Sequence, residues 1–438
     1  MASVSQYHGD RGILAETSAT PVFPTYNKFE MRVDIALLAS ALFLQRFSVP
    51  FFGKLQTLDF VFATFILVHQ FASGRLLIQY DRFAWFLVMA LAATFSLLLN
   101  FNSGMLTSYG LFVVVYILFT LSRPSTPNQY KNTLQGFQLL VLIISCLAIL
   151  QFPAQLVMDG GKLIMFYGIF PDFLLPPPGS SGANTIIPIF GGSSLIKSNG
   201  IFLSEPSVLS QITALGILIE VLEFGRPQYL FVMALGFLMA YSGTGLITLL
   251  LFLPFTCLRH GRAGLSTLLI VIFALGFFAI GIIDVSVFLG RVGEFQTTNS
   301  SGSMRFVSPL WLAVKYFDIA SLQALLVGNG PGTAKAFIDT WYVATTPTWF
   351  KLVYEYGIIG SFIFVCFLAS CLTKSRCPWP LLGALIVMLI LGNGGSFLNP
   401  TFLTVVIVLS TLHGPEPRRG HINETGQHRS SFAGSATG

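Results

Sequence analysis

Long apolar runs separated by short polar segments fill the chain from about residue 33 to residue 413. Most runs are roughly 16–25 residues long, the length at which a helix crosses a hydrocarbon core about 30 Å thick. This pattern predicts an all-α polytopic membrane protein with about twelve transmembrane helices. The predicted spans are 33–50, 57–73, 82–100, 105–122, 133–152, 205–224, 227–242, 244–258, 264–286, 352–373, 379–393 and 399–413.

The basic residues indicate how these spans are oriented. If the N-terminus is cytoplasmic, 15 of the 24 Lys and Arg residues fall in inner loops and tails, whereas the short outer loops hold only Arg46 and Lys54. Because cytoplasmic loops carry the excess of basic residues, both termini are expected in the cytoplasm, as tails 1–32 and 414–438, the latter disordered. The first 30 residues lack the apolar region of a cleavable signal peptide, so the first span is expected to direct the chain to a bacterial inner membrane.

Two long loops, 153–204 and 287–351, are predicted on the same outer (periplasmic) face of a single transmembrane domain, 33–413. Within the second loop, the segment 309–326 has an amphipathic helical pattern suited to lying along a membrane surface. Loops of this length usually carry function, and we therefore expect the binding site among them.

Composition narrows the class of protein. A mean hydropathy of +0.75 and 54% hydrophobic residues exclude an ordinary soluble domain, and the net charge of +6 reflects cytoplasmic loops rather than nucleic-acid binding. Ionisable residues inside the spans fall toward helix ends, where snorkelling to the interface would explain them. A proton-coupled transporter would instead carry charges near the midplane. The residues near the ends are Asp34, His69, Glu220, Glu223 and Asp284.

The outer loops gather most of the remaining charged residues, together with many aromatic ones. All six histidines lie outside these loops, so nucleophilic catalysis by a Ser–His or Cys–His pair is not expected there. The sequence shows no Asp-x-Asp pair or His/Cys cluster that would suggest a metal. Cations and isolated carboxylates beside the lipid suit a lipid-linked phosphate or pyrophosphate, with Arg as a bidentate clamp and Lys as a point charge.

Four motifs follow one another between about residues 195 and 375. They are Lys197-Ser-Asn-Gly200-Ile-Phe-Leu-Ser-Glu205-Pro206-Ser207; Ser242-Gly-Thr-Gly245; Ser301-Gly-Ser-Met-Arg305 with Trp311 and Gly328-Asn-Gly-Pro-Gly332; and Tyr354-Glu355-Tyr356-Gly357-Ile-Ile-Gly360. In this order they resemble the motifs of Wzy-type polysaccharide polymerases, which share a superfamily with O-antigen ligases. Lys197 stands where that family usually has arginine. Thr346-Pro347 stand where the ligases carry a His-Asn-like pair, which favours a polymerase.

The resemblance implies a metal-independent, GT-C-like membrane glycosyltransferase without a cofactor. Such an enzyme would polymerise oligosaccharide repeats linked to a polyprenyl (undecaprenyl) pyrophosphate into exopolysaccharide or O-antigen at the periplasmic face. Its expected partners are this lipid-linked oligosaccharide, membrane lipids, and the flippase and chain-length or export proteins of the same pathway, with no nucleic acid. The implied catalytic residues are Glu205 and Arg305, and the implied substrate-binding residues are Lys197, Arg291, Glu355 and Trp311.

Several of these residues also have structural explanations. Ser204 is a good helix N-cap, and an acidic residue followed by proline is ordinary in a first turn, so Glu205 needs no function to be there. Arg291 directly follows a span and would suit headgroup anchoring, and Glu355 would suit a helix face packed against a neighbour. The segment 328–332 is not followed by Gly-Lys-Ser/Thr and is expected to be a turn joining two surface helices.

Two other functions stay open at this point. A ligase would transfer the finished glycan to a lipid or protein, and a flippase would move the lipid-linked oligosaccharide across the membrane. The flippase would need a charged central cavity, which the predicted spans do not supply.

Overall fold

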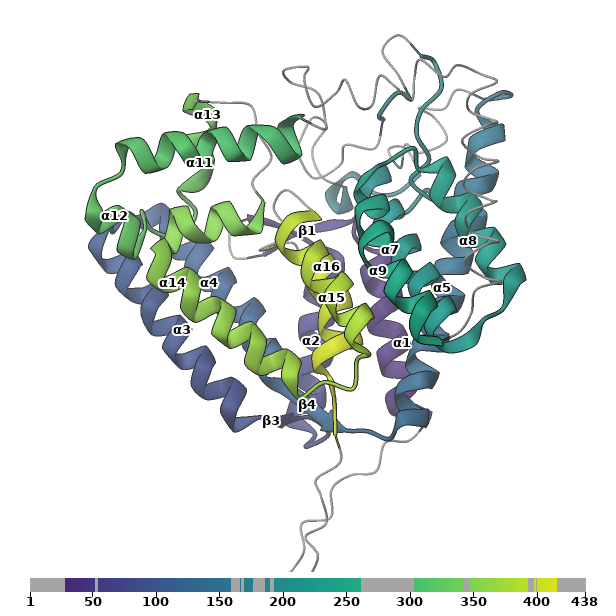
Figure 1. The fold of residues 1–438 in the computed structure, drawn as a ribbon, viewed down its shortest axis with the longest axis horizontal. Coiled ribbons are helices and arrows are strands. Elements are labelled where there is room, and N and C mark those ends of the chain that lie inside the picture. Colours follow the sequence, from purple (N-terminus) through teal and green to yellow (C-terminus); the bar gives the residue numbers. More distant parts are fainter. Residues whose placement is uncertain are drawn as a thin grey trace, which may run out of the picture.

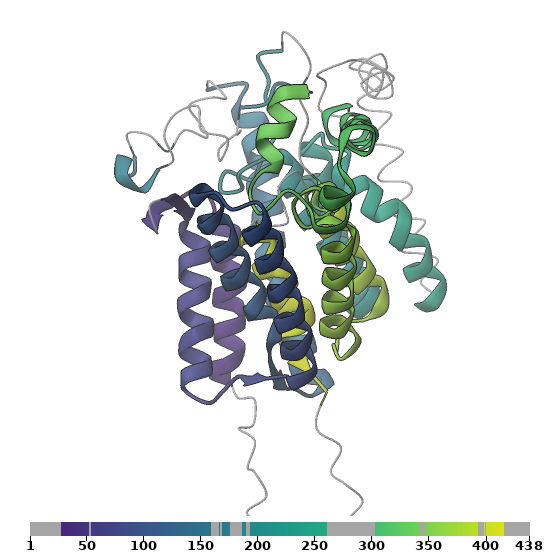
Figure 2. The same cartoon turned by 90° about the vertical axis from the view of Figure 1, so that its left-hand side faces the viewer.

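The structure is a computed structural model and describes residues 28–51, 54–158, 166, 169–175, 186–189, 193–260, 303–341, 347–392, 398 and 400–415. The described part is mostly helical (Figure 1), with a few short strands at the two ends of the helix bundle. In Figure 2 the N-terminal helices, coloured purple to blue, stand nearly parallel beside one another, as in a bundle that crosses a membrane.

The helices of the first half are α1 (Lys28–Phe43), α2 (Leu58–Ala72), α3 (Tyr80–Leu99), α4 (Ser103–Ile117) and α5 (Pro127–Ala154). Those of the second half are α7 (Pro206–Ile219), α8 (Pro227–Met239), α9 (Thr244–His260), α11 (Ser308–Ile319), α12 (Leu322–Val327), α13 (Ala334–Trp341), α14 (Thr348–Thr373), α15 (Trp379–Val387) and α16 (Pro400–Val406). Short π-helical turns, Glu220–Phe224, Met388–Gly392 and Ile407–Thr411, continue α7, α15 and α16.

Every predicted span overlaps one of these helices except 264–286, which lies outside the described residues. Within the described part, five helical segments are long and apolar enough to cross a membrane: Tyr80–Leu99, Ser103–Thr120, Pro127–Ala154, Pro206–Phe224 and Thr348–Thr373. Other apolar helices there, including Leu58–Ala72 and Pro227–Met239, are shorter. The chain is therefore a helical, membrane-type protein, and the count of twelve spans and the cytoplasmic placement of both termini stay predictions.

Helix starts follow local sequence rules. Thr126 caps α5 in a capping box, because its hydroxyl accepts from the Gln129 N–H and the Gln129 side chain accepts from the Thr126 N–H. Pro127 at the first helical position has no N–H to lose, so α5 begins six residues before the predicted span. Ser204 was expected to cap α7, but the cap residue is Glu205 and Pro206 opens the helix.

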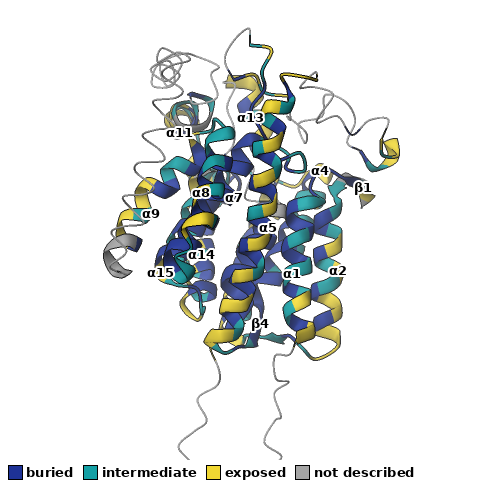
Figure 3. Cartoon of the chain, turned by 90° about the vertical axis from the view of Figure 1, so that its right-hand side faces the viewer, coloured by how far each residue is buried: buried dark blue, intermediate teal, exposed yellow. Residues whose placement is uncertain are grey.

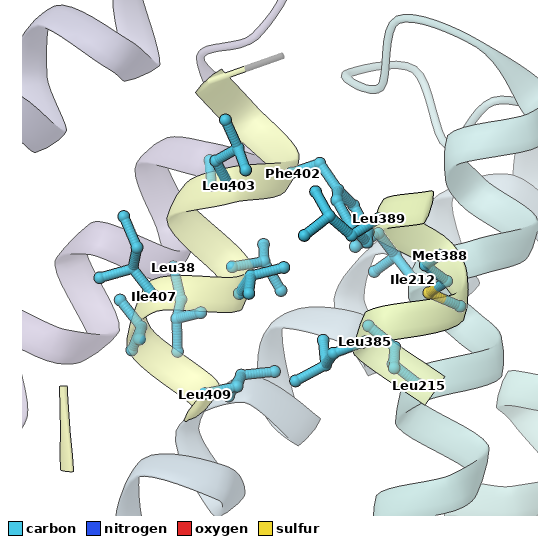
Figure 4. Close-up of a cluster of buried hydrophobic side chains, with 14 of the residues drawn as sticks. Leu38, Ile212, Leu215, Leu385, Met388, Leu389, Phe402, Leu403, Ile407 and Leu409 are labelled. Carbon is cyan, nitrogen blue, oxygen red and sulfur yellow. The ribbon is translucent and has the colours of Figure 1, made fainter. Parts of the chain in front are cut away.

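Helix α7 forms the centre of the bundle, and all its residues are buried. It packs closely against α5 and α8, since a Cβ added at Gly216 would lie 2.7 Å from Val141 and 2.9 Å from Met233. Ile212 and Leu215 of α7 face Leu385, Met388 and other apolar residues of the last helices (Figure 4). Figure 3 shows exposed residues along the outer sides of α2 and α5, where a membrane protein faces lipid.

The short strands lie at opposite ends of the bundle. Strands β1 (Ser48–Phe51) and β2 (Lys54–Thr57) pair antiparallel. At the other end, β3 (Leu77–Ile78), β4 (Leu121–Pro124) and β5 (His413–Gly414) form a small sheet in which β4 and β5 are parallel. The first predicted span was therefore too long, because α1 ends at Phe43 and the chain enters β1 at Ser48.

Two of the acidic residues near span ends do not snorkel. Asp34 is fully buried and forms an ion pair with Arg123, and its Oδ2 lies 3.3 Å from Nε2 of His413. Glu220 is also fully buried, and its carboxylate accepts hydrogen bonds of 2.7–3.0 Å from the backbone and guanidinium of Arg226. The prediction that Asp34 and Glu220 reach the membrane–water interface is therefore wrong. Both carboxylates are buried and paired with an arginine.

Candidate functional site

The loop before α7, which carries the first motif, is held by its backbone against α5. The side-chain oxygen of Gln151 accepts from three consecutive N–H groups, those of Asn199 (3.1 Å), Gly200 (3.0 Å) and Ile201 (3.3 Å). Gly200 has a φ of +67° and lies so near Ile144 that an added Cβ would be 2.8 Å from that side chain. Glycine is needed here for both reasons, and the loop has a fixed path over the end of α5.

A second amide on α5 holds the same loop. Gln155 lies one helical turn after Gln151 and makes two hydrogen bonds with the backbone of Ile196, of 2.8 Å from the N–H and 3.0 Å to the carbonyl. Both glutamines are buried, so these bonds are shielded from water. The two amides therefore clamp the segment on either side of Lys197.

The end of α1 holds the other side of this loop. Gln45 accepts a 3.0 Å hydrogen bond from the Ser204 N–H, and Arg46 donates one of 2.5 Å to the carbonyl of Ile201. The guanidinium of Arg46 also lies 3.9 Å from the ring centre of Phe166, a cation–π contact. The loop is thus fixed between α1 and α5, which prevents its charged residues from moving freely.

Lys197 lies in this held segment and is buried, with 8% of its surface exposed. Its N–H donates to the carbonyl of Ile187 (2.8 Å), and the next N–H, of Ser198, donates to the carbonyl of Met239 at the end of α8 (3.1 Å). The backbone beside Lys197 is therefore next to the turn between α8 and α9, which carries the second motif.

Glu205 is the N-cap residue of α7, but its side chain makes no capping hydrogen bond. Its Oε2 instead accepts a 2.8 Å hydrogen bond from the hydroxyl of Ser207. The carboxylate is partly exposed, at the end of an otherwise buried helix. The described contact of this carboxylate is therefore with the first turn of its own helix, through the Ser207 side chain.

A group of hydroxyls connects the first motif to the second. The Thr244 hydroxyl lies 3.0 Å from that of Ser210 and 3.1 Å from that of Ser242, and it donates to the carbonyl of Ser207 (3.3 Å). At Gly245 the helices α7 and α9 touch, since an added Cβ would lie 2.1 Å from the carbonyl oxygen of Ser210. The structure therefore brings the two motifs into contact, through Ser198 with Met239 and through Ser207 and Ser210 with Thr244, which their sequence separation does not show.

The third and fourth motifs meet in a second region, formed by α11, α12 and α14. In Figure 1 this region lies on the side of the bundle opposite α7 and α9. The segment 328–332 joins α12 to α13, as predicted for a turn between helices. Its Asn329 and Gly330 N–H groups donate to the carbonyls of Tyr354 (2.9 Å) and Glu355 (3.0 Å). Gly357 interrupts α14 with a φ of +68°, so these carbonyls accept bonds from the turn instead of from the helix.

Glu355 is buried, with 1% of its surface exposed, and its backbone carbonyl also accepts a 2.8 Å hydrogen bond from the Ser96 hydroxyl of α3. Its Oε1 accepts a 3.4 Å hydrogen bond from the Ala334 N–H and lies 3.9 Å from Nζ of Lys351. This arrangement favours the explanation of Glu355 as a helix residue packed against its neighbours.

The segment 309–326 was predicted as one amphipathic helix, but it forms two, α11 and α12, separated at Ala320-Ser321. Ser321 is the N-cap of α12, because its hydroxyl accepts a hydrogen bond from the Ala324 N–H. A new helix therefore starts here, and α11 does not continue. On α11, Leu312 and Tyr316 are buried, whereas the opposite side exposes large apolar side chains. The exposed ones are Leu310, Trp311, Val314, Phe317 and Ile319. Helix α11 is therefore apolar on both sides.

The buried side of α11 packs into an aromatic group on α13 and α14. The rings of Tyr316 and Phe337 lie 4.8 Å from that of Tyr354, between ring centres. Burial raises the pKa of the Tyr316 phenol, and the hydrogen bond from the Asn329 amide (3.1 Å) lowers it by less. The phenol is thus a neutral hydrogen-bonding group that ties α11 to the turn before α13.

The predicted arginines are the least defined part of the site. Arg305 belongs to a π-helical turn, Ser303–Val307, that leads directly into α11, but only its backbone is described. Arg291 lies outside the described residues. Among the described residues, no group of three or more His, Cys, Asp or Glu could hold a metal ion.

Four side chains that hold the site, Gln45, Arg46, Gln151 and Gln155, were not predicted to do so. Gln151 and Gln155 lie at the end of an apolar run, at the last turn and the C-cap of α5, and are four residues apart on one helix face. That spacing of uncharged polar residues at the end of an apolar helix is the signal that would have found these two glutamines.

Comparison with known proteins gives one family. The family model described as WcaD colanic acid polymerase matches residues 34–413. A comparison with curated proteins gives no match. The matched range includes all the described helices from α2 to α16 and all four motifs.

Proposed function

The chain belongs to the WcaD colanic acid polymerase family, a family of polysaccharide polymerases, and on this premise we propose that it joins lipid-linked oligosaccharide repeats at the periplasmic face of the bacterial inner membrane. This agrees with the resemblance to Wzy-type polymerases. The observation that supports the proposal is the contact between the first two motifs, in which the Thr244 hydroxyl donates to the carbonyl of Ser207 and the Ser207 hydroxyl donates to Glu205.

In the proposed reaction, the growing glycan leaves a polyprenyl pyrophosphate and joins the terminal sugar of an incoming lipid-linked repeat. A hydroxyl oxygen of the acceptor sugar bonds to the anomeric carbon of the donor, and the bond from that carbon to the pyrophosphate oxygen breaks. The pyrophosphate keeps the electron pair. Glu205 takes the proton from the acceptor hydroxyl as a general base, without a metal. Its partial exposure and its hydrogen bond from Ser207 support this role.

Cations stabilise the negative charge that develops on the leaving pyrophosphate. Arg305 is the main candidate, together with Arg291 or Lys197, because arginine binds phosphate oxygens bidentately and lysine adds a point charge. Trp311 and Glu355 complete the proposed binding residues, with Glu355 acting through the turn that it holds. Lys197 is supported by its fixed backbone beside the second motif.

Helix α11 is proposed to cover the entry path of the lipid carrier. Its exposed apolar residues, Trp311 and Phe317 among them, suit contact with lipid, and Figure 1 shows the helix lying across the end of α14. A movement of this helix would open the path to the lipid-linked substrate. Arg305 belongs to the π-helical turn directly before this helix, which supports its assignment to the same path.

The first test is the substitution Arg305→Ala in cells that make the polymer. We expect polymer chains to disappear while single repeats remain, because the leaving group loses its stabilising charge. The matched control is Lys335→Ala, which removes an exposed cation from α13 in the same outer region. Normal chain lengths at normal protein levels in the Arg305 variant would contradict its role.

The second test is Glu205→Gln, which keeps the shape of the side chain and removes the base. We expect loss of polymerisation, whereas Glu223→Gln, at the opposite end of the same helix, should polymerise normally. Unchanged polymerisation would leave Glu205 as a helix-start residue only. The product also separates the functions: single repeats attached to their final acceptor indicate a lost polymerase, free glycan a lost ligase, and repeats on the cytoplasmic face a lost flippase.

A further inference from the structure

Two described residues other than glycine have a positive φ, Ile201 (68°) and Tyr241 (44°). Side chains with a Cβ rarely adopt this left-handed conformation, and bulky ones least of all. Such strain persists only where the surroundings enforce it, and it gathers at functional sites. Ile201 lies within the first motif and Tyr241 directly precedes the second, so the strain of the described backbone coincides with the candidate site.

Tyr241 occupies the link between the two parts of this site. Two residues before it, the carbonyl of Met239 accepts from the N–H of Ser198, next to Lys197. One residue after it, the hydroxyl of Ser242 lies 3.1 Å from that of Thr244, which contacts the backbone of Ser207. Tyr241 is therefore within two residues of the contact beside Lys197 and within one residue of the hydroxyl group that leads to Ser207, next to Glu205.

The Tyr241 ring is held in place and remains partly exposed. It stacks on Phe152 of α5, with the ring centres 5.8 Å apart and the planes inclined by 19°. A fixed, partly exposed aromatic ring can receive the apolar C–H face of a sugar ring.

We propose that Tyr241 is a sugar-binding residue, whose ring receives the terminal pyranose of the acceptor repeat. The inference rests on the proposed function, because it places the acceptor hydroxyl next to the base Glu205. The left-handed conformation thus occurs at the residue whose ring stacks on Phe152. Asparagine or glycine would satisfy the backbone better, but neither would supply a ring.

The test compares Tyr241→Asn, which suits the left-handed backbone and removes the ring, with Tyr241→Phe, which keeps the ring. The probe is the polyprenyl-pyrophosphate-linked repeat extracted from cells that lack the chain, added to the purified protein. Binding is measured as the rise in the thermal unfolding midpoint that the repeat produces, and turnover as polymer formed. The wild type, Tyr241→Phe and Glu205→Gln proteins should all be stabilised by the repeat.

For Tyr241→Asn we expect the unliganded midpoint to equal or exceed that of the wild type, since strain is relieved. Its affinity for the repeat should fall about tenfold, the effect expected of a lost aromatic contact. Wild-type affinity in this variant would overturn the inference, and so would a lowered unliganded midpoint with unchanged affinity, which would indicate packing alone. Polymer formation by Glu205→Gln would instead contradict the role of Glu205 as the base. Failure of the Tyr241 inference appears in the affinity and failure of the proposed function in the turnover, so the two can be distinguished.

Discussion

The hydroxyl of Ser207 donates a 2.8 Å hydrogen bond to Oε2 of Glu205, two residues earlier. Ser207 itself lies in the first turn of α7, and its carbonyl accepts from Ser210 (2.9 Å) and Thr244 (3.3 Å). The carboxylate at the start of the buried helix is therefore oriented by a residue that is fixed to both α7 and α9. If Glu205 is the base, this bond sets the direction in which it accepts a proton.

The substitution Ser207→Ala should therefore slow polymerisation by about tenfold or more, because a hydrogen bond to a charged group contributes about 1.5–3 kcal/mol. Ser207→Thr, which keeps the hydroxyl, should restore most of the rate. The measurement is the initial rate of polymer formation by equal amounts of purified protein. Ser370→Ala is the control, since that hydroxyl bonds only within α14, to Phe367. Equal rates for the Ser207→Ala and wild-type proteins would refute the positioning role.

Gly245 should not tolerate a side chain. In Gly245→Ala the new Cβ would lie 2.1 Å from the Ser210 carbonyl oxygen, so α7 and α9 would have to move apart. Overpacking of this kind costs about 1–3 kcal/mol or more. We expect a lower unfolding midpoint in detergent and less protein in the membrane.

Gly243→Ala is the matched control for this substitution. Gly243 belongs to the same turn, but an added Cβ there would meet nothing within 4 Å. It should keep the wild-type midpoint. The same loss of stability in both variants would mean that the turn needs glycine for its flexibility, and that the contact between α7 and α9 is not the cause.

The sequence predicted most of the helical framework, because apolar runs bounded by proline, glycine and polar residues define helices locally. It placed α14 within four residues, and α15 together with its π-helical continuation to Gly392 within one. The first span was extended into β1 because the strand residues Ser48–Phe51 are themselves mostly apolar and continue the run. Local hydropathy cannot distinguish a short outer strand from the end of a helix.

The roles of Lys197 and Glu205 stay predictions. The sequence could propose these two residues because their motif is contained in one stretch of chain. The contact of this stretch with Thr244, and its support by Gln151, depend on how α5, α7 and α9 pack, which residue spacing does not encode. The buried pair of Asp34 and Arg123 was missed for the same reason, because its members are 89 residues apart in sequence.

Gly357 combines a left-handed backbone with a close contact. Its φ is +68°, and an added Cβ would lie 2.4 Å from the carbonyl of Leu326 in α12. Gly357→Ala should therefore lower the free energy of unfolding by about 1–2 kcal/mol, because alanine is strained in the left-handed conformation. It should lower it further because the new Cβ would push α12 and α14 apart. We expect a lower unfolding midpoint and a greater susceptibility of 303–341 to added protease.

Gly74→Ala separates these two effects. Gly74 has almost the same φ, +67°, but nothing lies within 4 Å of an added Cβ. Its midpoint should fall less than that of Gly357→Ala, and the protease sensitivity of 303–341 should not change. Equal losses in the two variants would show that backbone strain alone explains the effect, without the contact to Leu326.

Asp34→Asn should destabilise the bundle strongly, because it removes the negative charge from beside the buried guanidinium of Arg123. Side chains of the pair are 0% and 3% exposed, and breaking one partner of a buried ion pair costs about 3–5 kcal/mol. The loss should appear as a lower unfolding midpoint and less protein in the membrane. This pair joins α1 to β4, and β4 pairs with β5 at the end of the chain, so the change acts on three distant segments at once.

Asp81→Asn supplies the control for the buried pair. Asp81 is paired with Lys374, but these side chains are 65% and 52% exposed, so water and salt screen their attraction. An exposed pair contributes about 0–1 kcal/mol, and the midpoint should hardly change. At high salt concentration, Asp81→Asn should no longer lower the unfolding midpoint, whereas Asp34→Asn should still lower it. If the two variants lost the same stability, or if salt abolished the difference between them, burial would not be what makes the Asp34 pair important.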